Sequence, residues 1–175
     1  GEAYFAGGVC YGVQMLLHGG QALGWIQGST AGLLIGIGPT IAFIALMVWL
    51  SWRHRDMQPA SVTGRAVQAV FAGVGLGNLA LVAIIGVAAW RHRSLDVWLI
   101  YPCVVMVLQG IAWGVAWAVR RRTWLACVAG GWFVVGIAMA LAIPDKAAFV
   151  IITGLGLLLF MLVPGWVMMR QPKAD

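Results

Sequence analysis

The chain alternates between long apolar stretches and short polar connectors. A helix needs about 20 residues to cross a hydrocarbon core roughly 30 Å thick. Each apolar stretch reaches that length, and the connectors carry the glycines, prolines and charges typical of helix ends. The pattern therefore predicts a bundle of about six transmembrane helices, with spans at 4–26, 30–52, 66–90, 97–119, 123–142 and 147–169.

Composition supports a membrane protein. The chain is 62% hydrophobic and only 9% charged, whereas a soluble domain carries about 25% charged residues. The connectors are short, so residues 1–175 are predicted to form one all-α membrane domain without a soluble domain. Hydroxyl and acidic side chains at the span starts are candidate helix caps. They are Ser29 or Thr30 for the second span, Ser94 or Asp96 for the fourth, and Thr123 for the fifth.

Basic residues are unequally divided between the two ends of the spans. With six spans, both termini lie on one side, and that side holds eight of the 11 Lys and Arg residues. This bias predicts cytoplasmic termini in the inner membrane of a bacterium. The first span has no basic stretch before it and does not resemble a cleaved signal peptide. The basic clusters indicate contact with lipid headgroups rather than nucleic acid, and the candidates are Arg53, Arg55, Arg120, Arg121 and Arg122.

The predicted spans carry no chemistry that is typical of an enzyme. All five acidic residues lie at chain ends or in connectors, and no Asp, Glu, Lys or Arg lies deep in a span. Ion-coupled transporters usually keep an acid at depth, and acid–base catalysis needs such groups as well. The three cysteines, Cys10, Cys103 and Cys127, have no metal-ligand spacing and are interpreted as packing residues. The sequence predicts no metal site and no catalytic residue.

Small residues and prolines inside the spans predict close packing and bends. Pairs of glycines four residues apart let helix backbones approach each other. They occur at Gly8/Gly12, Gly20/Gly24, Gly32/Gly36, Gly73/Gly77 and Gly110/Gly114. Pro39 and Pro164 fall within spans, where each removes a backbone hydrogen bond and bends the helix. Both are candidate hinges.

One face of the first span carries a polar stripe. In "YGVQMLLHGGQALGW", the residues Tyr11, Gln14, His18, Gln21 and Trp25 are spaced three and four apart, which places them on one helix face. Buried amides need hydrogen-bonding partners. The other intramembrane amides are Asn78 in the third span and Gln109 in the fourth, with Trp113 one turn beyond Gln109. We expect Gln14, Asn78 and Gln109 to converge on a small polar pocket that opens along His18 and Gln21.

Three interpretations of His18 remain open. It is a structural imidazole, a ligand contact in an outward-facing cavity, or an axial ligand of haem, for which the adjacent Gly19 and Gly20 would make room. A second haem ligand is hard to find, because His92 lies at a helix end and His54 on the opposite side. No other cofactor is predicted.

Two segments of the chain resemble a known group of proteins. "AYFAGGVCYG" and "GLLLFMLVPGWVMMR", together with six spans and short loops, are similar to small six-helix inner-membrane proteins of bacteria, a loose group without an established function. Some members are encoded beside winged-helix regulators. The resemblance implies a signalling or accessory role and gives no binding residues.

Three functional classes follow. The first is a non-enzymatic membrane protein with a binding or accessory role, regulatory and sensory roles included, whose partners are the bilayer and either another protein or further copies of itself. The second is a transporter of a neutral or hydrophobic solute, although no inverted repeat is evident. The third is a haem-dependent electron carrier that uses His18.

Overall fold

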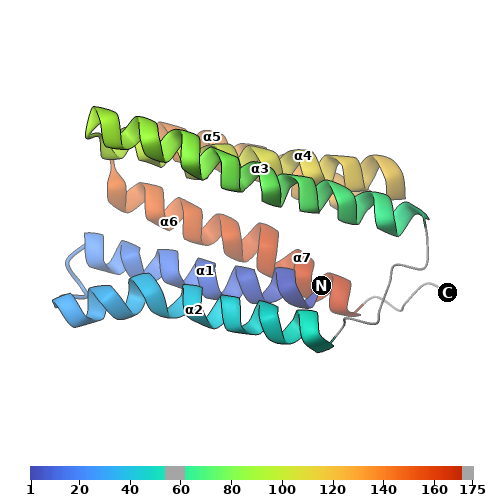
Figure 1. The fold of residues 1–175 in the computed structure, drawn as a ribbon, viewed down its shortest axis with the longest axis horizontal. Helices are drawn as coiled ribbons and strands as arrows, with labels where there is room; N and C mark the ends of the chain where they lie inside the picture. The colour runs from blue at the N-terminus through green and yellow to red at the C-terminus, as the bar shows by residue number, and fades with distance from the viewer. Residues whose placement is uncertain (54–61, 171–175) are drawn as a thin grey trace. The chain divides into compact units, whose positions relative to one another are not determined.

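The computed structural model describes residues 1–53 and 62–170, and these residues are helical apart from short connections. Figure 1 shows the chain as long helices. They are α1 (Glu2–Ala22), α2 (Ser29–Arg53), α3 (Val62–His92), α4 (Leu95–Arg120), α5 (Thr123–Leu141) and α6 (Lys146–Leu157), which continues through the π-helical segment η1 (Leu158–Leu162) into α7 (Val163–Arg170).

The predicted helices agree with the observed ones to within four residues at every end. Five are long and apolar enough to cross a membrane: α2, α3, α4, α5 and the continuous α6–η1–α7 helix. The first predicted span, α1, is not among these five. Its 21 residues include Glu2, Gln14, His18 and Gln21 as well as several glycines, so its hydropathy is lower than that of the other helices.

The helices group into two compact units. Unit 1 contains α1, α2, α6, η1 and α7, and unit 2 contains α3, α4 and α5. In unit 1, α1 contacts α2 as well as the α6–η1–α7 helix, and in unit 2, α4 contacts both α3 and α5. The central helix of unit 1 is α1, the first of that unit in chain order, whereas the central helix of unit 2 is α4, the second of its unit. The two units do not repeat one chain order.

In unit 1, α1 packs antiparallel to α6–η1–α7. Glycines of one helix or the other lie at successive heights (levels) along this contact. Gly8 and Gly12 lie against Leu162 and Leu158, and Gly19 lies against Ile151. At other levels the glycine is on the opposite helix, so that Gly165 faces Phe5 and Gly154 faces Leu16. Because glycine stands at each of these contacts, the two backbones approach closely along most of α1. The Gly8/Gly12 pair, selected by its spacing in the sequence, lies at this contact.

The contacts at these levels are tight. A β carbon built on Gly12 would lie 2.8 Å from Cδ2 of Leu158, and one on Gly19 would lie 2.9 Å from Cγ1 of Ile151. A β carbon on Gly8 would overlap the backbone nitrogen of Leu162. The two segments that carry the resemblance to the inner-membrane group therefore pack on each other here.

In unit 2, the core lies between α4 and α5. Trp132 and Met139 of α5 are fully buried, and Gly110 of α4 receives the ring of Phe133, with a virtual β carbon 2.9 Å from Cε1. Gly114 of α4, and the Gly73/Gly77 pair of α3, have no neighbour within 4 Å. Only part of the glycine pairing predicted from spacing is therefore realised as helix contact.

The helix caps and the prolines inside the helices agree only in part with the prediction. Ser94 caps α4 as predicted, and Asp145, which was not predicted, caps α6 by accepting bonds from the amides of residues 147 and 148. The prediction that Thr123 caps α5 is wrong, because the cap is Arg122 and Thr123 is already helical. Pro39 lies inside α2, Pro164 follows the π-helical segment, and Pro102, overlooked in the sequence, lies inside α4. A π-helical turn supplies the altered hydrogen bonding that a following proline requires.

Candidate functional site

The polar stripe of α1 faces α2 within unit 1. The ring of Tyr11 lies 5.0 Å from that of Phe43, with the two planes tilted by 58°. Gln14 bonds to the backbone of Gly36, and a β carbon on Gly32 would lie 3.5 Å from Nε2 of Gln21. The glycines of α2 at positions 32 and 36 thus leave room for the amide side chains of α1. We call Gln14, His18 and Gln21, with the Gly36 carbonyl, the polar seam.

Gln14 bonds to α2 close to Pro39. Pro39 has no N–H, so the carbonyl of Ile35, four residues earlier, loses its helical donor. The neighbouring carbonyl of Gly36 accepts a hydrogen bond of 2.9 Å from Nε2 of Gln14. The amide orientation follows from this contact, because a flipped amide would place two oxygens together. Gln14 is only 5% exposed, so this bond is made where water does not supply a substitute.

The other end of the Gln14 amide is not used by the described residues. Its Oε1 is buried and has no hydrogen-bond partner within residues 1–53 and 62–170. An unsatisfied buried acceptor costs about 1–3 kcal/mol. By contrast, the buried hydroxyl of Thr153 donates a 2.7 Å bond to the carbonyl of Phe149. The Gln14 oxygen is therefore a buried acceptor without a donor among the described residues.

His18 and Gln21 form a pair one turn apart. Nδ1 of His18 lies 2.9 Å from Oε1 of Gln21, and in the neutral tautomer that donates from Nδ1 to this oxygen, Nε2 is an acceptor. Both side chains are half-buried, whereas Trp25, the last member of the predicted stripe, lies beyond the end of α1 and is 79% exposed. The seam therefore presents two acceptors, Gln14 Oε1 and His18 Nε2, on the same helix face.

The remaining predicted site residues belong to unit 2. Trp113 is buried between the rings of Phe71 and Trp124, at centroid distances of 5.7 and 5.9 Å. Gln109 is half-buried one turn before it on α4, and Oδ1 of Asn78 on α3 is buried without a partner among the described residues. The convergence of Asn78 and Gln109 with Gln14 stays a prediction, because the two units are described separately.

The haem interpretation requires space beside His18. Gly19 and Gly20, which were expected to provide that space, are instead in contact with Ile151 and Ile26. The space expected at these two glycines is therefore occupied by side chains of α6 and of the turn after α1.

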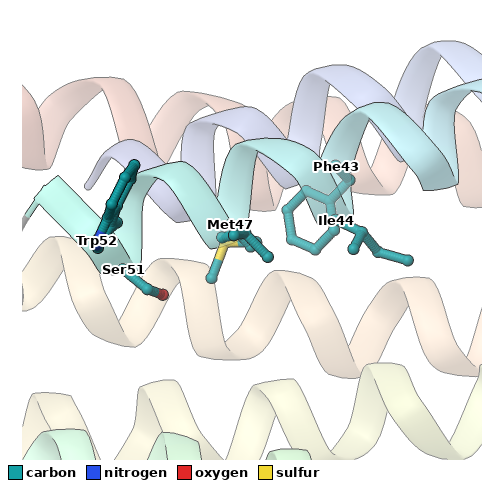
Figure 2. Close-up of a pocket in the computed structure, with 6 residues that line it drawn as sticks. Phe43, Ile44, Met47, Ser51 and Trp52 are labelled. Atoms are coloured by element: carbon teal, nitrogen blue, oxygen red, sulfur yellow. The ribbon is translucent and has the colours of Figure 1, made fainter.

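A second, apolar feature lies on α2. Figure 2 shows a hollow lined by Phe43, Ile44, Met47, Val48, Ser51 and Trp52, all from this helix. The lining is almost entirely apolar. Phe43 also contacts Tyr11, the first residue of the polar stripe of α1, so the hollow lies beside that end of the stripe. Sequence reasoning missed this feature, and also the Gly36 carbonyl, because Pro39 points to the neighbouring carbonyl of Ile35.

Four of the five predicted headgroup arginines lie at helix ends. Arg53 ends α2, Arg120 ends α4, Arg121 follows it in a left-handed conformation with φ of 54°, and Arg122 precedes α5. Arg55 lies outside the described residues.

Comparison of the chain with protein-family models, curated proteins and solved structures found no match. Function is therefore inferred from the geometry of the chain itself.

Proposed function

We propose that the protein is a non-enzymatic multi-pass membrane protein that binds a small neutral molecule at the polar seam of unit 1 and has a binding or accessory role. The observation that supports this proposal is the buried Oε1 of Gln14, which lacks a donor among the described residues. The adjacent Nε2 of His18 offers a second acceptor. A molecule with O–H or N–H donors would satisfy both.

The charge of the ligand follows from its surroundings. Within the described helices, Asp, Glu, Lys and Arg stand only in the first or last turns, and the seam itself carries no charged residue. An ion taken into such a site would lose its hydration without gaining a counter-charge. The proposed ligand is accordingly neutral.

The test is thermal unfolding of the purified protein with a panel of neutral alcohols and amides. A ligand at about 100 times its dissociation constant stabilises the folded state by about 2.7 kcal/mol. We expect at least one solute to raise the unfolding temperature of the wild type, and Gln14→Leu to abolish the rise. Gln27→Leu is the control, because Gln27 is exposed and bonds only to the Gly24 carbonyl. Equal stabilisation of wild type and Gln14→Leu would contradict the proposal.

Transport of a neutral or hydrophobic solute is the second candidate. Pro39 favours it, because a proline inside a helix is a candidate hinge and this one lies three residues after Gly36, to which Gln14 of the seam bonds. Flux of the stabilising solute out of protein-containing liposomes distinguishes transport from binding. The haem alternative predicts an absorption band that is lost in His18→Ala, and a colourless protein would eliminate it.

The proposed topology has six crossings, with both termini in the cytoplasm of a bacterial cell. Although α1 is less hydrophobic than the other helices, it lies along the α6–η1–α7 helix over nearly its whole length, which supports a crossing at the same depth. Gln27→Cys, in the turn after α1, should then react with a membrane-impermeant maleimide added to intact cells. Thr123→Cys, at the start of α5, should not react; the reverse pattern would overturn the topology. Both variants leave the charge bias unchanged and are made with the native cysteines replaced.

A further inference from the structure

A recurring pair of residues marks the end of several helices. Tryptophan is followed four residues later by arginine at Trp49–Arg53, Trp117–Arg121 and Trp166–Arg170. Arg53 and Arg170 are the last residues of α2 and α7, and Arg121 is the C-terminal cap of α4. Residues four apart share a helix face, so Arg53 and Arg170, which are still helical, stand beside their tryptophans where the helices end.

In unit 1 these pairs are stacked. The guanidinium carbon of Arg170 lies 4.0 Å from the ring centroid of Trp166, and that of Arg53 lies 5.1 Å from the ring centroid of Trp49. Because α1 is antiparallel to both α2 and α7, both pairs lie at the end of unit 1 where α1 begins. Both arginines are exposed, and the tryptophans are 43% and 49% exposed.

Stacking determines what the arginines can still bind. The ring occupies one face of the guanidinium, while the N–H groups point outward in its plane and stay available as a fork of donors. That fork matches two oxygens of a phosphate. A free helix C-terminus would repel an anion, because its carbonyls carry partial negative charge, and the terminal arginine offsets this charge.

We propose that Arg53 and Arg170, each held by its tryptophan, bind the phosphate of anionic phospholipid headgroups. The depth is appropriate, since both pairs end helices of membrane-crossing length, and tryptophan prefers the headgroup region. The charge is complementary, since the described residues at this end of unit 1 include one acid, Glu2, and the whole chain has a net charge of +6. A zwitterionic headgroup would bring a cation to the same arginines.

The test is native mass spectrometry of the full chain equilibrated with equal amounts of phosphatidylglycerol and phosphatidylcholine. We expect the wild type to retain phosphatidylglycerol preferentially. Arg170→Gln and Arg53→Gln should each weaken its binding about fivefold, the factor expected for one basic residue near an anionic surface. Arg65→Gln is the matched control, because Arg65 is exposed at the start of α3, which follows α2 on the same side of the membrane, and has serine rather than tryptophan four residues before it.

Two further variants distinguish binding by the stacked Trp–Arg pair from attraction by net charge alone. Arg170→Lys keeps the charge but loses the planar fork, so it should weaken phosphatidylglycerol binding, and Trp166→Leu should do the same. An equal loss in Arg65→Gln and Arg170→Gln, or wild-type binding by Arg170→Lys, would show that only net charge matters and would overturn the proposal. Equal retention of the two lipids, or displacement of the lipid by inorganic phosphate, would overturn it as well.

Discussion

Gly8→Ala is expected to lower the free energy of unfolding by about 3 kcal/mol, at the upper end of the usual range for overpacking. A β carbon at this position would overlap the backbone nitrogen and Cα of Leu162. Backbone atoms cannot rotate out of the way, so the variant must separate α1 from η1 and loosen the neighbouring levels of the contact. Chemical unfolding in mixed micelles, followed by circular dichroism, measures the loss.

The control for this prediction is Gly73→Ala. Gly73 belongs to a glycine pair with the same four-residue spacing, but nothing lies within 4 Å of its virtual β carbon. Its replacement should leave stability unchanged or raise it slightly, because alanine favours a helix over glycine. If Gly8→Ala proves as stable as Gly73→Ala, the close contact between α1 and η1 is incorrect.

A second large effect is expected at the next level of the same contact, and it should be reversible. Gly12→Ala would place a β carbon 2.8 Å from Cδ2 of Leu158, a side-chain atom rather than backbone. The cost should be about 1–3 kcal/mol. Trimming the opposing side chain with Leu158→Ala removes the obstruction, so the double variant should lose less stability than the two single variants together, by about 1 kcal/mol.

The double-mutant cycle of Gly8 and Leu162, one helical turn earlier on α1, should behave differently. Gly8→Ala meets the backbone of Leu162, so Leu162→Ala cannot restore the fit. Measured in the same unfolding assay, the Gly12–Leu158 cycle should show strong coupling and the Gly8–Leu162 cycle little. Additive losses at Gly12 and Leu158 would contradict the register assigned to α1 and α6–η1–α7.

The helices were predictable from sequence because membrane-length apolar runs need only local information. The helix partners were not, because spacing alone does not distinguish Gly8/Gly12, which contacts η1 and its neighbours, from Gly73/Gly77, whose virtual β carbons have no described residue within 4 Å. Contact depends on whether a large side chain faces the glycine from a helix distant in sequence. The register between α1 and α6–η1–α7 is a non-local property of this kind.

The candidate site was predictable only where local information is enough, as for the helices. The stripe of Gln14, His18 and Gln21 follows from helix periodicity, but its partner on α2 does not. The amide of Gln14 meets a backbone carbonyl, and carbonyls are present at every residue, so side-chain composition gives no signal for it. Pro39 gives only an indirect signal, since the carbonyl that it leaves without a helical donor is that of Ile35, the neighbour of Gly36.

The central claim is that the polar seam holds open acceptors for a neutral donor, and nitrogen-15 NMR of histidine-labelled protein tests it most directly. The predicted result is a neutral His18 with its proton on Nδ1, bonded to Gln21, and an unprotonated Nε2 whose resonance moves when the stabilising solute is added. The signal of His92, at the exposed end of α3, should stay unchanged. A proton on Nε2 of neutral His18, or an Nε2 resonance that ignores the solute, would contradict the account.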